Sequence, residues 1–365
     1  MASYGAPKVY RATNLPHHVD RLAAAELLVR CNPGITLEDT QIESIAPVVD
    51  PWVSELTKVA TLRFKSAPVA LQGPGRMEWS FPILGSLRSI TLDIHFHGLT
   101  PLNELYRDIR PGKPPDGILA AMGRLSFMWI RDALPSRLPG VRFIIYGYDT
   151  ALSGSKSFQV VPDIAGSLIS ELKANGWAAP AAKPIIFLAH SLGGVVLKQS
   201  MVMLAGSGVR EREIIRNIKG AIFFGVPTVG MTVPDIYEML EDQPNTALLD
   251  DLSNRSNYIP TLEKQFDGIS YTRDMVLFWA YETQASPVYL GGWKRSGPDT
   301  VMVSPESATG GRHGISPERL LQIDADHSNM VKFKPGDRLI PIMADKIREI
   351  IDNAMIYASA KTLAG

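Results

Sequence analysis

The sequence predicts an α/β fold with a mostly parallel central sheet flanked by helices, preceded by a small α+β unit. Extended and helical patterns alternate over residues 85–365, which is typical of βαβ units. A short apolar run from Pro184 to Ala189 leads directly into a helical pattern, as expected of a buried parallel strand. Residues 1–75 follow a different pattern. A chain of 365 residues is long enough for both parts.

The composition disfavours several classes of function. The 37 basic residues balance the 37 acidic residues, so no net charge attracts the chain to nucleic acid or to an anionic membrane. Cys31 is the only cysteine, which rules out an internal disulfide and fits a reducing compartment. No stretch reaches the roughly 18 uninterrupted apolar residues of a membrane-spanning helix. We therefore expect a soluble, intracellular protein without a nucleic-acid partner.

The first 75 residues predict a small ferredoxin-like unit. A strand is expected over Val9–Pro16, a helix over His18–Arg30 and a further strand over Lys58–Phe64. Such a unit resembles a degenerate RNA-recognition module, in which bases stack on strand aromatics, here Tyr10 and Phe64. Because the segment lacks a dense basic patch, a structural appendage is favoured over an RNA-binding face.

The next expected strand, Ile90–His97, carries two histidines on one face. His95 and His97 are two residues apart, a spacing that suits a pair of metal ligands on a strand. No further ligand cluster lies nearby in the sequence. We therefore expect no metal site.

The remaining elements alternate as a parallel sheet requires. The expected helices are Ser126–Leu134, Asp163–Trp177, one that follows Ser191, and Ile340–Tyr357; the expected strands are Val141–Tyr148, Pro184–Ala189, Ile218–Gly225, Met275–Tyr281 and Thr300–Val303.

Ser191 is the leading catalytic candidate. It lies where an apolar strand turns into a helix, in Ala189-His190-Ser191-Leu192-Gly193, which follows the Gly-x-Ser-x-Gly nucleophile-elbow pattern with alanine in the first glycine position. A serine hydroxyl is a weak nucleophile, so it must stand clear of the backbone beside a base. The N–H groups that begin the helix favour a developing oxyanion. A chance strand-to-helix turn is the alternative, and the context on both sides of Ser191 disfavours it.

The general base should lie toward the C-terminus, because the chain order in this arrangement is nucleophile, acid, histidine. Only His313 and His327 follow Ser191. His327 comes after the last expected strand and before the closing helix, and we expect it to be the base. His313 lies in a glycine-rich loop and is the weaker candidate. His190 adjoins Ser191, and the tight turn should direct it elsewhere to pack locally.

Sequence spacing does not decide which carboxylate orients the base. Glu282 ends the strand Met275–Tyr281, and Glu306 follows the strand Thr300–Val303, so either carboxylate suits the role. Asp324 and Asp326 are too close in sequence to His327 to orient it easily. Spacing alone leaves the two glutamates nearly even, with a solvated loop charge as the alternative for each.

An ordered set of segments resembles the serine esterase and lipase family of α/β-hydrolases, and among its members the fungal proteins similar to the serine-active-site-containing protein. The resemblance covers roughly Ile90 to Ile351. It rests on His97-Gly98-Leu99, Trp129-Ile130-Arg131-Asp132, Tyr146-Gly147-Tyr148-Asp149, Ala189-His190-Ser191-Leu192-Gly193-Gly194, Phe223-Phe224-Gly225-Val226-Pro227, Tyr281-Glu282-Thr283 and Asp326-His327-Ser328.

The resemblance implies hydrolysis of esters or lipid esters without a metal or organic cofactor, and it favours Glu282 as the acid. It also implies that the protein can associate with mitochondria or with the endoplasmic reticulum. Peripheral contact with a membrane is compatible with this expectation. The oxyanion would be held by the backbone N–H groups of Leu99 and of Leu192, the residue after the nucleophile.

The early loop departs from the family pattern. Such proteins usually have His-Gly-Leu-Gly-Gly there, whereas Thr100-Pro101 follows His97-Gly98-Leu99 in this chain. Pro101 has no N–H to donate and stiffens the loop. Losing the Leu99 donor would cost on the order of 3 kcal/mol of transition-state stabilisation. A scaffold that binds a lipid or protein partner without turnover is therefore the alternative to an esterase.

Overall fold

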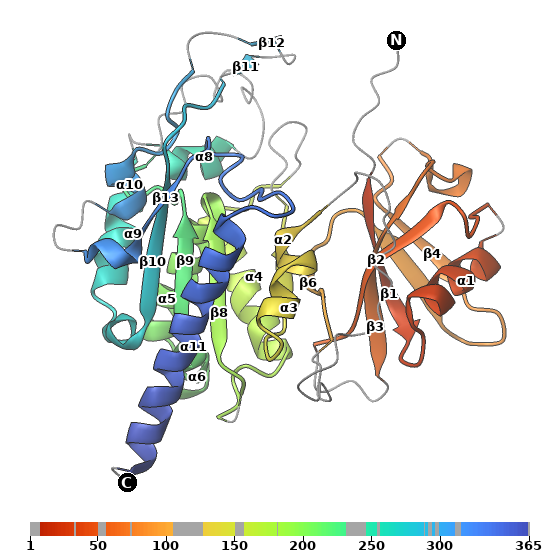
Figure 1. Cartoon of the computed structure of the whole chain (residues 1–365), viewed down its shortest axis with the longest axis horizontal. Coiled ribbons are helices and arrows are strands. Elements are labelled where there is room, and N and C mark those ends of the chain that lie inside the picture. Colours follow the sequence, from red (N-terminus) through yellow and green to blue (C-terminus); the bar gives the residue numbers. More distant parts are fainter. Residues whose placement is uncertain are drawn as a thin grey trace. The chain divides into compact units, whose positions relative to one another are not determined.

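The structure is a computed structural model that describes residues 8–32, 34–49, 56–73, 75–104, 127–149, 157–180, 182–230, 246–253, 256–287, 289–290, 294–295, 299–310 and 315–363. The chain folds into two compact units, Met1–Asp149 and Thr150–Gly365. Figure 1 shows both units, coloured along the chain.

The first unit is built on a five-stranded antiparallel sheet with the strand order β2-β3-β1-β5-β4. Its core includes Tyr10, Leu28, Leu62 and Leu92, all nearly inaccessible to solvent. The elements are β1 (Val9–Pro16), α1 (Arg21–Cys31), β2 (Thr40–Pro47), β3 (Thr57–Phe64), a short 3-10 turn η1 (Val69–Leu71), β4 (Glu78–Pro82) and β5 (Ser89–Asp93). Strands β1 and β3 and helix α1 appear where the sequence predicts them, and the ferredoxin-like assignment stays a prediction.

Strand β5 belongs to the antiparallel sheet of the first unit. The sequence pattern places the segment that begins at Ile90 in the large domain of residues 85–365, but β5 pairs with β1 and β4 in the antiparallel sheet. The chain up to Asp149 accordingly belongs to the first unit, which differs from the predicted break between residues 75 and 85. Period-2 alternation indicates a strand without showing which strand it will pair with.

The first unit also contains a two-stranded antiparallel ladder and two short helices. The ladder joins β6 (Gly98–Pro101) to β7 (Ile144–Gly147), so that β7 is not in the parallel sheet where the sequence analysis places it. The helices are α2 (Trp129–Asp132) and α3 (Leu134–Arg137), at the expected helical stretch.

The second unit confirms a parallel sheet flanked by helices. Four strands run in the order β13-β10-β9-β8, and all neighbours are parallel. The strands are β8 (Ile185–His190), β9 (Ile218–Phe224), β10 (Val276–Glu282) and β13 (Leu320–Ile323). Both inner strands are almost entirely buried, which explains their continuous apolar sequences.

Helices cover both faces of this sheet. Helix α11 (Leu339–Leu363) crosses in front of it in Figure 1, and α5 (Leu192–Gly206) lies behind. Gly220 of β9 approaches Ile350 of α11, while Phe223, three residues further along β9, contacts Lys198 of α5 on the opposite face. The other elements are α4 (Val161–Ala174), α6 (Val209–Asn217), α8 (Thr246–Leu252), α9 (Tyr258–Asp267), η2 (Ser270–Asp274), β11 (Tyr289–Leu290), β12 (Lys294–Arg295), α10 (Pro305–Thr309) and η3 (Pro317–Arg319).

The expected strand Thr300–Val303 is wrong. Thr300 makes a single bridge to Ser286, and α10 begins at Pro305. The last strand is β13, which the sequence analysis misses because its four residues are too short for a period to be visible. The base candidate His327 therefore follows β13, at one edge of the sheet.

Candidate active site

Ser191 occupies a strained turn between β8 and α5. Its backbone has φ 50° and ψ −126°, a left-handed conformation that costs a non-glycine residue about 1–3 kcal/mol. Two hydrogen bonds hold the turn: Ser191 N–H donates to the Phe224 carbonyl at 3.0 Å, and Gly194 N–H donates to the Ser191 carbonyl at 2.9 Å. A sharp turn of this kind is the conformation that exposes the serine hydroxyl in a nucleophile elbow.

Gly194 lets α5 pack closely beside this turn. A Cβ at this position would lie 2.1 Å from Cγ2 of Val226, in the loop after β9. Since real Cβ atoms do not approach other atoms this closely, only glycine fits without a shift of Val226. Packing thus explains Gly194, the residue after the motif's own glycine, Gly193.

His327 lies against Ser191. Its Nε2 is 2.9 Å from Ser191 Oγ, and its side chain is nearly buried. Strands β8 and β13 lie at opposite edges of the four-stranded sheet, about 14 Å apart at the usual strand spacing. The loop after β13 therefore has to cross the ends of β10 and β9 to bring His327 to Ser191.

Glu282, the last residue of β10, contacts the other nitrogen of this imidazole. Its Oε2 is 2.6 Å from His327 Nδ1, and the glutamate is 1% exposed. A carboxylate accepts the hydrogen bond, so Nδ1 carries the proton and Nε2 is left to accept from Ser191. The structure thus brings Ser191, His327 and Glu282 into one hydrogen-bonded path.

Three supporting contacts are not predicted from the sequence. Met302 and Val303 donate their backbone N–H groups to Glu282 Oε1 at 2.9 and 3.2 Å. Ser286 Oγ accepts from His327 N–H at 3.3 Å. The first two residues belong to the strand that the sequence wrongly suggests, and no pattern marks their N–H groups as donors to a carboxylate.

His190 also contacts His327, although its position beside the tight turn suggests that it packs elsewhere. Its Nε2 lies 2.9 Å from the His327 carbonyl oxygen, and the two rings are 4.8 Å apart. Burial, followed by the proximity of His327, lowers the pKa of His190 to about 4. At neutral pH His190 is therefore an uncharged hydrogen-bond donor.

Leu192 begins α5, directly after Ser191. The first N–H groups of a helix have no intrahelical acceptor, and they carry the positive end of the helix dipole. The Leu192 N–H is therefore suited to hold an anion beside the serine.

Leu99, the other donor expected from the resemblance, lies in β6 of the first unit. Leu102 N–H donates to the Phe143 carbonyl at 2.9 Å, and in an antiparallel ladder hydrogen-bonded pairs alternate with non-hydrogen-bonded ones. Because Leu102 is in a hydrogen-bonded pair, the preceding position in the alternation, held by Pro101, is non-hydrogen-bonded, and so is that of Leu99 two residues earlier. The Leu99 N–H thus points away from β7, and Pro101 costs the ladder no hydrogen bond.

Thr100, which stands where the family that the sequence resembles has glycine, is anchored by Arg11. Arg11 Nη1 donates to Thr100 Oγ1 at 3.0 Å and to the His97 carbonyl at 2.8 Å, while its Nε donates to Asp93 at 2.8 Å. Asp93 also accepts from Phe96 N–H at 2.8 Å. The departure from the family pattern therefore supplies a buried contact to the segment that carries Leu99.

Comparisons with known proteins point to a distant relationship. No protein-family model matches the chain. Mouse protein SERAC1 is 26% identical to this chain over 223 residues, which cover 60% of this chain and 32% of the mouse protein. The human protein SERAC1 is 24% identical, with the same coverage of both chains. The zebrafish protein SERAC1 is 26% identical over 217 residues, which cover 58% of this chain and 31% of the zebrafish protein. The chain is distantly related to SERAC1.

The match is partial, since the chain spans about a third of the length of these relatives. Among solved structures, the crystal structure of the Bacillus licheniformis lipase BlEst2 in mature form aligns with a TM-score of 0.36 and 13% identity, over 57% of this chain and 81% of the lipase.

The remaining candidates of the sequence analysis lie elsewhere. Glu306 is exposed in the first turn of α10, and His313 lies outside the described residues. His95 and His97 have rings 4.4 Å apart, and His95 approaches Glu78 at 3.3 Å. Among the residues that the structure describes, no group of three or more potential ligands is arranged to hold a metal ion.

The aromatic residues considered for RNA binding are part of the core of the first unit. Tyr10 and Phe64 are 3% and 4% exposed and pack edge to face, with 5.2 Å between ring centroids. Their rings are not available for stacking on bases. Within the described part of the chain, no helix combines the length and the apolar character needed to cross a membrane.

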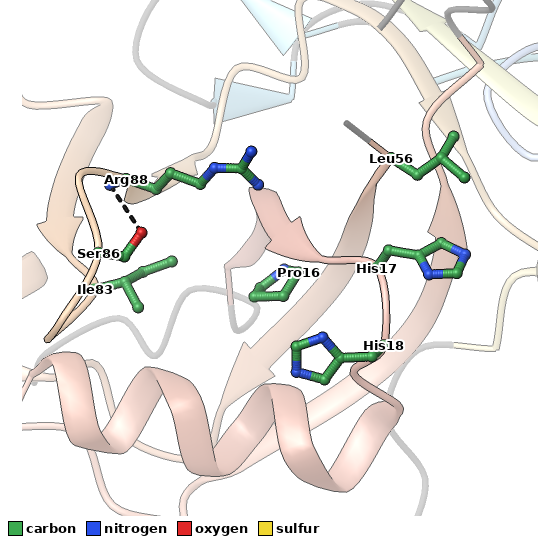
Figure 2. A pocket seen from close by; sticks show the side chains of 7 residues that line it. All are labelled: Pro16, His17, His18, Leu56, Ile83, Ser86 and Arg88. Carbon is green, nitrogen blue, oxygen red and sulfur yellow. Dashed lines mark hydrogen bonds between the residues drawn. The ribbon is translucent and has the colours of Figure 1, made fainter. Parts of the chain in front are cut away.

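The first unit has a pocket of about 510 Å³ that contains none of these candidates. Figure 2 shows His17 and His18 beyond the end of β1, with Ile83, Ser86 and Arg88 of the β4–β5 hairpin on the other side. Pro16 and Leu56 complete the lining. Neither Ser191 nor its partners contribute to it.

Proposed function

We propose that the chain is a serine hydrolase of the α/β-hydrolase type that cleaves carboxylic esters. The observation that carries the proposal is the hydrogen-bonded path from Ser191 Oγ to His327 Nε2 at 2.9 Å and from His327 Nδ1 to Glu282 at 2.6 Å. The strained turn at Ser191 and the distant relationship to SERAC1 support it. The resemblance implies that no metal or organic cofactor takes part.

In the first half of the reaction, Ser191 Oγ attacks the ester carbonyl carbon while His327 Nε2 takes the hydroxyl proton. The carbonyl oxygen becomes an oxyanion, and Glu282 stabilises the imidazolium through Nδ1. The tetrahedral intermediate collapses when the bond to the alkoxy oxygen breaks, and His327 returns the proton to the departing alcohol. An acyl group then remains on Ser191.

Water completes the cycle by the same steps. His327 Nε2 accepts a proton from the water as its oxygen attacks the acyl carbon, and the proton goes back to Ser191 Oγ as the acyl bond breaks. The products are the carboxylic acid and the free serine. In our proposal the Leu192 N–H holds the oxyanion in both halves of the reaction, and the resemblance implies the Leu99 N–H as the second donor. Each donor is worth roughly 3 kcal/mol.

A lipid ester is the narrower form of this proposal, and it implies peripheral contact with a membrane. It rests on the resemblance alone. Hydrolysis of a long-chain ester presented in vesicles at a rate well above that of the butyrate ester in solution supports it; the reverse preference restricts the proposal to small esters.

Active-site labelling tests the core of the proposal. A fluorophosphonate probe phosphonylates only an activated serine, so we expect it to label the wild-type chain at Ser191 and not Ser191→Ala. Hydrolysis of p-nitrophenyl butyrate should fall about 10⁴-fold or more in both Ser191→Ala and His327→Ala. A folded wild-type chain that is neither labelled nor active would rule out the proposal.

A scaffold without turnover is the second candidate, and the Thr100-Pro101 sequence after Leu99 favours it. Such a scaffold would bind a lipid or a protein partner and hydrolyse no ester. A rate that depends on His327 would exclude it.

A further inference from the structure

His190 is the polar side chain of β8 that reaches the loop carrying the base. It is the last residue of β8 and directly precedes Ser191. Its Nε2 is 2.9 Å from the backbone oxygen of His327. A carbonyl oxygen can only accept, so the proton of the neutral His190 ring is on Nε2. Ser191, the proposed nucleophile, and His190, which donates to the backbone of His327, are therefore adjacent in the chain.

The topology explains why such a contact is needed. His327 follows β13 and must be held across the sheet ends at β8. Glu282 on β10 and Ser286 in the loop after β10 hold His327 from one side. The hydrogen bond from His190 reaches the His327 backbone from the other side, from the strand that carries Ser191.

We propose that His190 is a positioning residue that holds the His327 backbone and thereby maintains the distance between His327 Nε2 and Ser191 Oγ. This inference rests on the proposed function. A loss of the His190 hydrogen bond frees the loop to move on the β8 side, and a displacement of about 1 Å at a reacting group can reduce the rate about 100-fold.

The electrostatic surroundings suit a neutral donor at this position. The charged or titratable groups that act on His190 are His327, Glu282 and Lys332. During the reaction His327 becomes an imidazolium, and a second positive charge 4.8 Å from it would oppose that step. Burial keeps His190 uncharged, so it can donate its hydrogen bond without this penalty.

Two substitutions separate the hydrogen bond from the packing of the ring. His190→Gln keeps a neutral N–H donor, and His190→Phe keeps an aromatic ring without a donor. We expect His190→Phe to lower kcat for p-nitrophenyl butyrate about 10-fold or more with KM within about twofold of wild type, and His190→Gln to keep at least a third of the wild-type kcat. His17→Phe, at an exposed histidine of the first unit, is the control for the substitution itself.

Equal losses in the two variants, or a His190→Phe enzyme as fast as wild type, would overturn the inference. If His190→Phe does not fold, His190→Met removes the donor with a flexible apolar side chain. Thermal unfolding of each variant shows whether a change in kcat merely follows a change in stability.

A measurement that needs no turnover separates this inference from the proposed function. In protein labelled with ¹⁵N-histidine, NMR should show the Nε2–H form of His190. The downfield Nδ1 proton of His327 should be retained in His190→Gln and be broadened or lost in His190→Phe. If wild type neither hydrolyses esters nor binds the probe, the proposed function fails, while this signal still decides whether His190 holds His327. An unchanged signal in His190→Phe contradicts the inference.

Discussion

Arg11 and Thr100 are joined by a hydrogen bond of 3.0 Å between Nη1 and Oγ1, although 89 residues separate them in the chain. The same guanidinium pairs with Asp93, whose side chain is 2% exposed. β1 of the antiparallel sheet thus holds the segment that carries Leu99. Thr100, which stands where the family pattern has glycine, is thus integrated into a buried network.

Removing this guanidinium should destabilise the protein. Arg11→Met leaves the buried Asp93 carboxylate without its charged partner, and we expect a loss of about 3–5 kcal/mol in the free energy of unfolding. Chemical denaturation measures it. Arg348→Met is the matched control, because Arg348 pairs with Asp345 and the two side chains are 49% and 69% exposed; such a pair is worth at most about 1 kcal/mol. Equal losses in the two variants would argue against a buried network.

The two candidate acids can be compared directly. Glu282→Gln keeps the shape of the side chain but removes the charge that stabilises the His327 imidazolium, so kcat should fall about 10⁴-fold. Glu306→Gln changes an exposed side chain on α10 and should leave kcat within about twofold of wild type. Steady-state hydrolysis of p-nitrophenyl butyrate measures both. If kcat fell strongly in Glu306→Gln and not in Glu282→Gln, Glu306 and not Glu282 would be the acid.

The stability of the protein should depend on pH through His190. Its pKa is lowered from 6.5 to about 4 in the folded state, so the unfolded chain binds more protons between these values. Stability therefore rises with pH through this window, and acidification from about pH 6.5 to pH 4 should remove up to about 3 kcal/mol.

The difference in unfolding free energy between wild type and His190→Gln isolates this contribution, since the other titrating groups are common to both. We expect the advantage of wild type to shrink as the pH falls from about 6.5 to about 4. A difference that is constant with pH would show that His190 does not titrate with the lowered pKa.

Gly194 should not tolerate a side chain. In Gly194→Ala the new methyl group would overlap Val226, and we expect a loss of about 1–3 kcal/mol. Gly166→Ala, in α4, is the matched control, since the nearest atom to a Cβ there is 4.0 Å away; that change should stabilise the helix by about 0.5–1 kcal/mol. Adding Val226→Ala to Gly194→Ala should recover part of the loss in a double-mutant cycle.

Several parts of the fold can be predicted because their signals are local. The apolar run before Ser191 and the small residues around it indicate a strand, a turn and a helix over a few consecutive residues. The same holds for β9, β10 and α11. The short β13 and the bridge at Thr300 give no comparable signal, because four residues do not establish a period.

Pairing between strands is harder to predict. The alternation in β5 and the apolar residues of β7 indicate strands, but neither pattern shows that these strands lie outside the parallel sheet. Their partners are β1 and β4 for β5 and β6 for β7. These choices depend on register and on which faces are buried together, and neither quantity is a property of the strand alone.

The sequence by itself determined that a serine stands at a tight corner between a strand and a helix, since backbone sterics and the small residues beside it act over short range. Only the tertiary structure decided which side chains meet that serine. The contact of Glu282 with His327 and the hydrogen bond from His190 follow from the order of the strands, because residues 45 and 137 positions apart become neighbours only when the sheet is assembled.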